Sequence, residues 1–256
     1  MTDETETLTF TCYSDNFPIT IETSTDTSNW ETLGTIGLAD PYELTAQLQP
    51  NDKLYIRATA NSWCEYFDDE DYPVGCTISG ISKVGGNIMS LLYGSSFTGN
   101  ETTFPSNSTG NFAGLFSGTG LISASELILP AITLTEKCYR GMFYYCTSLT
   151  AAPELPATTL TQCCYAHMFK NCSLLTTAPD LPATILADFC YESIFEGCYL
   201  LNYIKCLATD KSASSCTYNW VSNVASSGTF VKDPNMSDWT TGESGIPSGW
   251  TVQDAA

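Results

Sequence analysis

The stretch LPAITLTEKCYRGMFYYCTSL, residues 129–149, decides the fold, because it returns twice at a constant spacing. LPATTLTQCCYAHMFKNCSLL occupies 155–175 and LPATILADFCYESIFEGCYLL occupies 181–201, so the repeat is 26 residues long. Its fixed positions are Leu-Pro-Ala at the start, followed by Cys-Tyr, Phe, Cys and Leu. A repeat of this length predicts a solenoid, in which each unit buries its apolar face only by stacking on its neighbours.

Each repeat divides into two pieces. Apolar residues at steps of four, the spacing of one helix face, are Leu134, Cys138, Met142 and Cys146. We therefore expect a helix over about 134–146, with Thr133 or Thr135 near its N-terminal end. The stretch 151–156 contains two prolines, which fix φ and disfavour helix in the residues before them, so it predicts an extended segment.

The repeats account for the C-terminal part of the chain, and other patterns precede them. We expect a solenoid over 112–256, with three regular turns between two degraded ones and a C-terminal cap. Residues 1–94 contain short alternating apolar and polar runs broken by Asn, Asp, Pro and Gly, which predict an antiparallel β-sandwich. Residues 95–111 are rich in Gly, Ser, Thr and Asn and predict a linker loop.

The composition excludes several classes of function. The net charge of −19 disfavours nucleic-acid binding, which requires cations that displace counterions from phosphates. No apolar run reaches the roughly 18 residues of a membrane span, so we expect no membrane insertion. The acidic start Met-Thr-Asp-Glu lacks the basic and apolar regions of a secretory signal, so we expect no encoded export signal.

The cysteines predict core packing more than chemistry. Seven of the twelve occupy repeat positions, namely Cys138, Cys146, Cys164, Cys172, Cys190, Cys198 and Cys216. A buried free cysteine behaves as a small hydrophobic residue. Spacings of 8 and 18 with a single histidine do not match a zinc site, so we predict neither metal nor cofactor. The sequence leaves open whether disulfides form, chiefly for Cys12, Cys64 and Cys76, which lie outside the repeats.

Two further features leave alternatives open. The acidic run from Asp68 to Asp71 is either a solvated loop or a calcium site, although it lacks the spacing of an EF-hand loop. Cys206 has no counterpart in the other repeats, and the repeat pattern offers no reason for it.

The run Phe-x-x-Cys-x-x-Leu at 143–149, 169–175 and 195–201 resembles the BspA-like leucine-rich repeats of surface proteins from gut and oral anaerobes and of their phages. The stretches Gly-Asn-Ile-Met-Ser-Leu-Leu-Tyr-Gly at 86–94 and Asn-Tyr-Ile-Lys-Cys-Leu-Ala-Thr-Asp at 202–210 resemble one gut-associated branch. The patterns and the resemblance together predict an α+β chain, with an N-terminal antiparallel β-sandwich followed by a short leucine-rich-repeat solenoid. The resemblance implies adhesion or recognition and supplies no catalytic residue.

Residues that vary between repeats are the candidates for a contact surface. They are Tyr144, Tyr145, His167, Lys170 and Tyr199. Tyrosine is enriched at interfaces, whereas the sole histidine at a variable position predicts no catalytic site.

The sequence therefore predicts a non-enzymatic recognition or adhesion module. Without an export signal, a phage virion surface protein, as a fibre or decoration, fits best. The partners would then be a protein or glycan surface of a host cell, together with capsid or fibre proteins. The alternative is a secreted or cell-surface bacterial adhesin whose signal has been removed. A glycan hydrolase needs a carboxylate pair in a cleft, and no motif pairs two carboxylates here.

Overall fold

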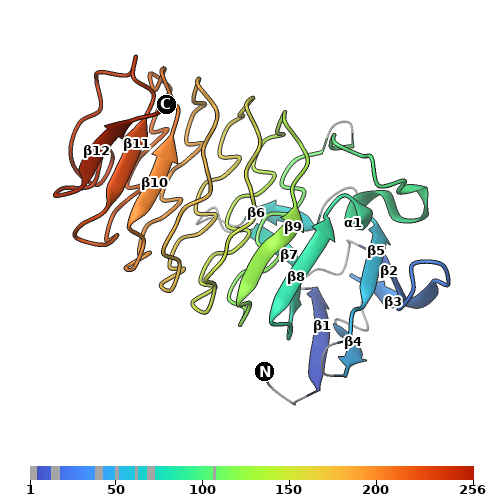
Figure 1. Ribbon diagram of the computed structural model, residues 1–256. Helices are drawn as coiled ribbons and strands as arrows, with labels where there is room; N and C mark the ends of the chain where they lie inside the picture. The colour runs from blue at the N-terminus through green and yellow to red at the C-terminus, as the bar shows by residue number, and fades with distance from the viewer. Residues whose placement is uncertain are drawn as a thin grey trace.

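The computed structural model describes residues 5–12, 18–37, 43–49, 52–60, 63–67, 73–105 and 108–256 (Figure 1). The N-terminal strands are β1 Glu6–Cys12, β2 Ile19–Ser24, β3 Glu31–Ile36, β4 Glu43–Leu48, β5 Tyr55–Thr59, β6 Cys64–Phe67 and β7 Pro73–Ser79. They are followed by β8 Lys83–Asn87, the helix α1 Ser90–Tyr93 and the 3-10 turn η1 Gly94–Ser96. The C-terminal strands are β9 Ser123–Ile128, β10 Tyr203–Cys206, β11 Thr229–Lys232 and β12 Thr251–Asp254.

The N-terminal strands form two antiparallel sheets, in the orders β4-β1-β7-β6 and β3-β2-β5. Alternation decides which face of each sheet is buried: Leu8 and Phe10 of β1 are buried, as are Ile19 and Ile21 of β2. These side chains belong to one hydrophobic core together with Trp63. The core is continuous with that of the repeats, so the two parts of the chain are packed together.

A disulfide joins Cys12 on β1 to Cys76 on β7, which are direct cross-strand partners. The sequence left the redox state of these two cysteines open, and the structure shows them bridged. The side chain of Cys64 and the acidic run from Asp68 to Asp71 lie outside the described part of the chain.

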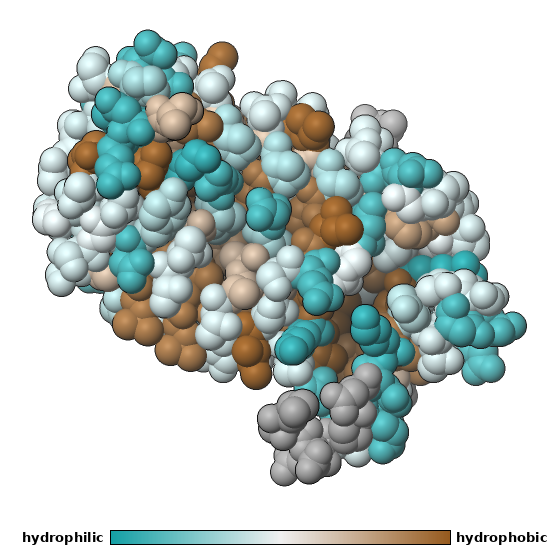
Figure 2. Space-filling view, viewed as in Figure 1, coloured by the Kyte–Doolittle hydropathy of each residue, from teal (hydrophilic) through white to brown (hydrophobic). Residues whose placement is uncertain are grey.

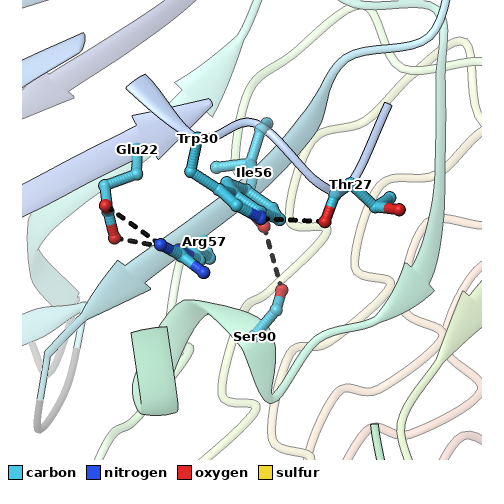
Figure 3. A network of polar contacts seen from close by, with 6 residues as sticks. All are labelled: Glu22, Thr27, Trp30, Ile56, Arg57 and Ser90. Carbon is cyan, nitrogen blue, oxygen red and sulfur yellow. Dashed lines mark hydrogen bonds and ion pairs between the residues drawn. The ribbon is translucent and has the colours of Figure 1, made fainter. Parts of the chain in front are cut away.

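A polar network fastens α1 to the second sheet (Figure 3). Ser90 of α1 donates a hydrogen bond to the carbonyl of Ile56 at 3.1 Å. The neighbouring Arg57 donates to both carboxylate oxygens of Glu22, at 2.9 and 3.1 Å. Its guanidinium lies 4.2 Å from the centroid of the Trp30 ring. The 86–94 motif therefore has a structural role at this junction, because it carries the helix that contacts β5.

From β9 onward the chain forms coils that stack in parallel (Figure 1). Parallel bridges join residues about one repeat apart, such as Thr133 with Thr159 and Thr177 with Tyr203. At the C-terminal end the bridges become a regular parallel sheet in the order β10-β11-β12. The extended segments thus lie on one face of the stack, which we call the strand face.

The other face of each coil is a run of consecutive turns, which we call the turn ribbon. It consists of residues 110–118, 137–145, 163–171, 189–197 and 215–223. Alternate backbone N–H groups close turns within the coil, as from Met142 to the Tyr139 carbonyl at 3.2 Å. The others donate to the next coil, as from Phe143 to the Met168 carbonyl at 2.9 Å. Every fourth residue has a positive φ, for example Lys137, Gly141 and Tyr145.

The predicted α+β class, with a leucine-rich-repeat solenoid that carries a helix in each turn, is wrong. The described residues are nearly all β, and their helical segments, α1 and η1, precede the repeats. The expected helix over 134–146 is a segment of the turn ribbon. A helix needs every N–H to bond within its own segment, whereas here half of the N–H groups bond to the next coil. The steps of four arise because two consecutive turns advance the chain by four residues.

The interior of the stack consists of columns of equivalent side chains. One column contains stacked Phe116, Phe143, Phe169 and Phe195, and another contains stacked Tyr139, Tyr165, Tyr191 and Trp220. Free cysteines form parallel columns, and three of their thiols donate to phenylalanine carbonyls of a preceding coil: Cys146, Cys172 and Cys198, at 3.0 to 3.1 Å. The predicted core role of the repeat cysteines is confirmed, because all seven are buried.

Two glycines of the turn ribbon give a test of its geometry. Both have a positive φ, +59° at Gly141 and +75° at Gly197. A Cβ at Gly141 would meet only Tyr144, at 3.7 Å, whereas a Cβ at Gly197 would lie 2.2 Å from Oδ1 of Asn171. In urea unfolding we expect Gly141→Ala to lower the free energy of unfolding by about 1 kcal/mol. Gly197→Ala should lower it by a further ~0.5 kcal/mol, because the Asn171 side chain must also rotate away from the new methyl group. Equal losses would contradict this geometry.

Candidate functional site

Four of the five predicted contact residues lie close together on the turn ribbon. Tyr144 and Tyr145 are on one coil, and His167 and Lys170 are on the next. The Tyr145 N–H donates to the Lys170 carbonyl at 2.9 Å, which fixes the two coils in register at this point. Tyr199 lies one coil further on and beyond the ribbon, at the corner that leads into β10.

Glutamates of the next coil lie beside the basic members of this group. Lys170 Nζ lies 2.9 Å from Glu196 Oε2, and His167 Nε2 lies 3.9 Å from Glu192 Oε2. All four side chains are roughly one-fifth to one-quarter exposed. Because the charge of Lys170 is already compensated by Glu196, this side chain contributes more to coil-to-coil cohesion than to attraction of an anionic ligand.

The tyrosines present more surface. The rings of Tyr144 and Tyr145 meet edge to face, with centroids 4.8 Å apart, which restricts both rotamers. Tyr145 is 50% exposed and Tyr199 is 61% exposed. These two rings are therefore available to a partner, whereas Tyr144 is half-buried and supports its neighbour.

The structure adds two aliphatic residues at the same corner. Leu174 is 45% exposed and Leu200 is 48% exposed, at equivalent positions of adjacent coils. We call Leu174, Tyr199 and Leu200 the corner patch; Tyr145 lies at the end of the turn ribbon, before the corner of its own coil. In Figure 1, β10 points upward, so the corner before it faces the lower edge of the coils, and Figure 2 shows hydrophobic surface gathered along that edge.

Sequence reasoning missed Leu174 and Leu200 because leucine in a repeat suggests core. A signal was nevertheless present, since the equivalent position of the preceding repeat is Ser148. A position that alternates between serine and leucine is unsuited to a packed column, so it indicates exposure.

The thiols of the repeats are buried, and the potential metal ligands of the described residues are dispersed. In the described residues, no three His, Cys, Asp or Glu side chains come together as metal ligands. Burial raises the pKa of the repeat thiols, for example that of Cys198 to about 12, and a protonated thiol is a poor nucleophile. None of the helical segments in the described ranges has the length and apolar character that a membrane crossing requires.

Comparison with known proteins identifies no relative. The chain matches no family model, no curated protein and no solved structure.

Proposed function

We propose that this chain is a non-enzymatic recognition and adhesion module that binds a partner surface through the corner patch. One observation carries the proposal: the three side chains of the patch are 45–61% exposed on a backbone held by hydrogen bonds between coils. Exposed apolar groups that gather on a rigid element mark interaction surfaces, and tyrosine is enriched in them. A preorganised patch also loses little conformational entropy on binding.

The proposed setting is the surface of a phage particle, where the chain is a fibre or decoration protein that contacts capsid or fibre proteins. Its outward partner is a protein or glycan of the host-cell surface. The resemblance of the repeat to phage-associated leucine-rich repeats supports this setting. The net charge of −19 supports a partner other than nucleic acid.

The disulfide between Cys12 and Cys76 favours a second candidate, a secreted or cell-surface bacterial adhesin. Disulfides form and persist in oxidising compartments, which exported proteins pass through while they fold. Proteins of a virion that assembles in a reducing cytosol meet an oxidising environment only after release.

Mass spectrometry of purified phage particles, with the whole-cell surface fraction as comparison, separates the two settings. The virion proposal predicts the intact chain in the particles. Recovery only from the cell surface, with a processed N-terminus, would refute the virion setting and leave the bacterial adhesin.

The role of the corner patch is tested by the double variant Leu174→Ser, Tyr199→Ser. We expect its labelled form to bind target cells at least tenfold more weakly than the original chain in flow cytometry, because it removes two of the three side chains of the patch. Its free energy of unfolding should change by less than about 1 kcal/mol, since both side chains are exposed.

The matched control is Ile185→Ser, Tyr218→Ser, which also removes one exposed aliphatic and one exposed aromatic residue, at 65% and 53% exposure. This variant should bind as the original chain does. Equal loss in both variants would show that the corner patch is not the contact surface, and binding to no bacterial strain in a broad panel would contradict the adhesion proposal itself.

A further inference from the structure

A second surface, on the strand face, forms a groove between β9 and the coil that follows it. The groove has a volume of about 200 Å³ and is lined by Ser125–Pro130 together with Glu154 and Pro156. It is smaller than the roughly 300–1,000 Å³ of pockets that hold drug-sized molecules, so its size suits a single side chain.

The groove has its origin in a difference of length between two coils. Parallel bridges join Ser123 to Ala151 and Thr133 to Thr159. The first coil thus advances ten positions from one bridged residue to the next, from 123 to 133, whereas the second advances eight, from 151 to 159. The surplus residues belong to the segment that contains β9, whose pairing with β8 shows a register shift. The segment 151–159, which faces β9 across the groove, contains Pro153 and Pro156. Proline has no backbone N–H, so these residues cannot donate hydrogen bonds to β9 that would draw the two segments together.

The lining is apolar with an acidic rim. Ile128 is 53% exposed, and Pro130 and Pro156 occupy equivalent positions in the two coils. Glu126 from β9 and Glu154 from the next coil are both exposed and both line the groove. Among the described residues, no cationic group pairs with either carboxylate.

Two other acids of the strand face are paired with lysines from a neighbouring coil. Asp180, one repeat after Glu154, has its carboxylate 2.7 Å from Lys205 Nζ. On the terminal sheet, Asp254 lies 2.5 Å from Lys232 Nζ. Glu126 and Glu154 differ from these two acids, because they line the groove together and no lysine of the described residues pairs with either. Neighbouring like charges destabilise a sheet, and a cation placed between them would relieve the repulsion.

We infer that the groove binds a lysine side chain carried on an extended segment of a partner protein. The aliphatic stem lies over Ile128 and Pro156, and the ammonium group lies between Glu126 and Glu154. Lysine has the required form, with an apolar stem and a compact charged end. This surface is distinct from the corner patch, so the inference stands independently of the proposed function.

The test uses two short peptides, acetyl-Leu-Lys-Leu-amide and its counterpart with norleucine in place of lysine, which retains the stem and removes the charge. Amide NMR titrations of the full chain should show shifts at Glu126, Ile128 and Glu154 with the lysine peptide. The norleucine peptide should bind at least tenfold more weakly. The variant Glu126→Gln, Glu154→Gln should abolish the difference between the peptides and retain the folded spectrum.

The control Glu31→Gln, Glu43→Gln removes the same charge from exposed positions on β3 and β4 and should keep the full preference for lysine. Shifts scattered over the surface, or equal weakening in both variants, would show general attraction to an acidic chain and overturn the inference. Equal affinity for both peptides in the original chain would overturn it as well.

Discussion

Replacing Phe169 with alanine should lower the free energy of unfolding by about 3–5 kcal/mol. The ring is fully buried and stacks on Phe143 at 5.5 Å and on Phe195 at 5.9 Å between centroids. The substitution removes both contacts and leaves a cavity in the middle of the column, where neither adjacent coil can close it without breaking backbone hydrogen bonds. Because the whole stability of a domain is about 5–15 kcal/mol, the variant should be close to unfolding.

Urea unfolding followed by tryptophan fluorescence measures this loss. Phe169→Leu should cost less than half as much, because it keeps most of the buried volume. Tyr218→Ala, at a 53% exposed position, should change stability by less than about 1 kcal/mol. A loss below about 1.5 kcal/mol for Phe169→Ala would mean that the aromatic column contributes little and that backbone pairing between coils dominates.

The repeat length could be read from the sequence, but the local conformation could not. Cys138 and Met142 lie four residues apart, which fits one face of a helix. The same spacing fits a ribbon of consecutive turns in which every fourth residue has a left-handed backbone conformation, with positive φ. The evidence against a helix is the hydrogen bonding between coils, for example from the Tyr139 N–H to the Cys164 carbonyl. Local sequence propensity does not report hydrogen bonds to a segment that is distant along the chain. The non-glycine residues at positive φ, among them Lys137 and Phe189, gave no local warning.

The candidate binding residues also divide into those that the sequence could indicate and those that required the structure. Tyr145 and Tyr199 could be proposed from the sequence because they vary between otherwise constant repeats. Leu174 needed the position of the corner, since a leucine alone does not report its exposure. The groove was beyond sequence reasoning, because it depends on how two coils of unequal length are paired between Ser123 and Thr159.

Alkaline pH should unfold this chain cooperatively, with a midpoint between about pH 9 and pH 10. Burial raises the pKa of seven repeat and core thiols, Cys138, Cys146, Cys164, Cys172, Cys190, Cys198 and Cys206. The pKa of Cys198 and of Cys206 is raised to about 12, whereas an exposed thiol has a pKa of about 8.5. Above that ordinary value the unfolded chain loses protons that the folded chain retains, so the free energy of unfolding falls as pH rises and continues to fall up to the folded-state pKa.

The magnitude follows from the number of thiols. At pH 10 a thiol with such a strongly raised pKa favours the unfolded state by about 2 kcal/mol, and the six strongly shifted thiols, Cys146 excepted, together favour it by about 12 kcal/mol, which is comparable to the whole stability of a typical domain. Between about pH 9 and pH 10 we therefore expect circular dichroism and the ultraviolet absorbance of thiolate to change together. The triple variant Cys146→Ala, Cys172→Ala, Cys198→Ala removes two of the six strongly shifted thiols and should reduce the pH dependence of the unfolding free energy to about two-thirds of the original slope. The substitutions also change the absolute stability, so the slope of the unfolding free energy against pH is the quantity to compare.

One outcome would contradict this prediction: formation of thiolate near pH 8.5 in a chain that keeps its native circular dichroism. It would show that the cysteine columns are open to water, and the sealed stack of coils could then not be the native arrangement.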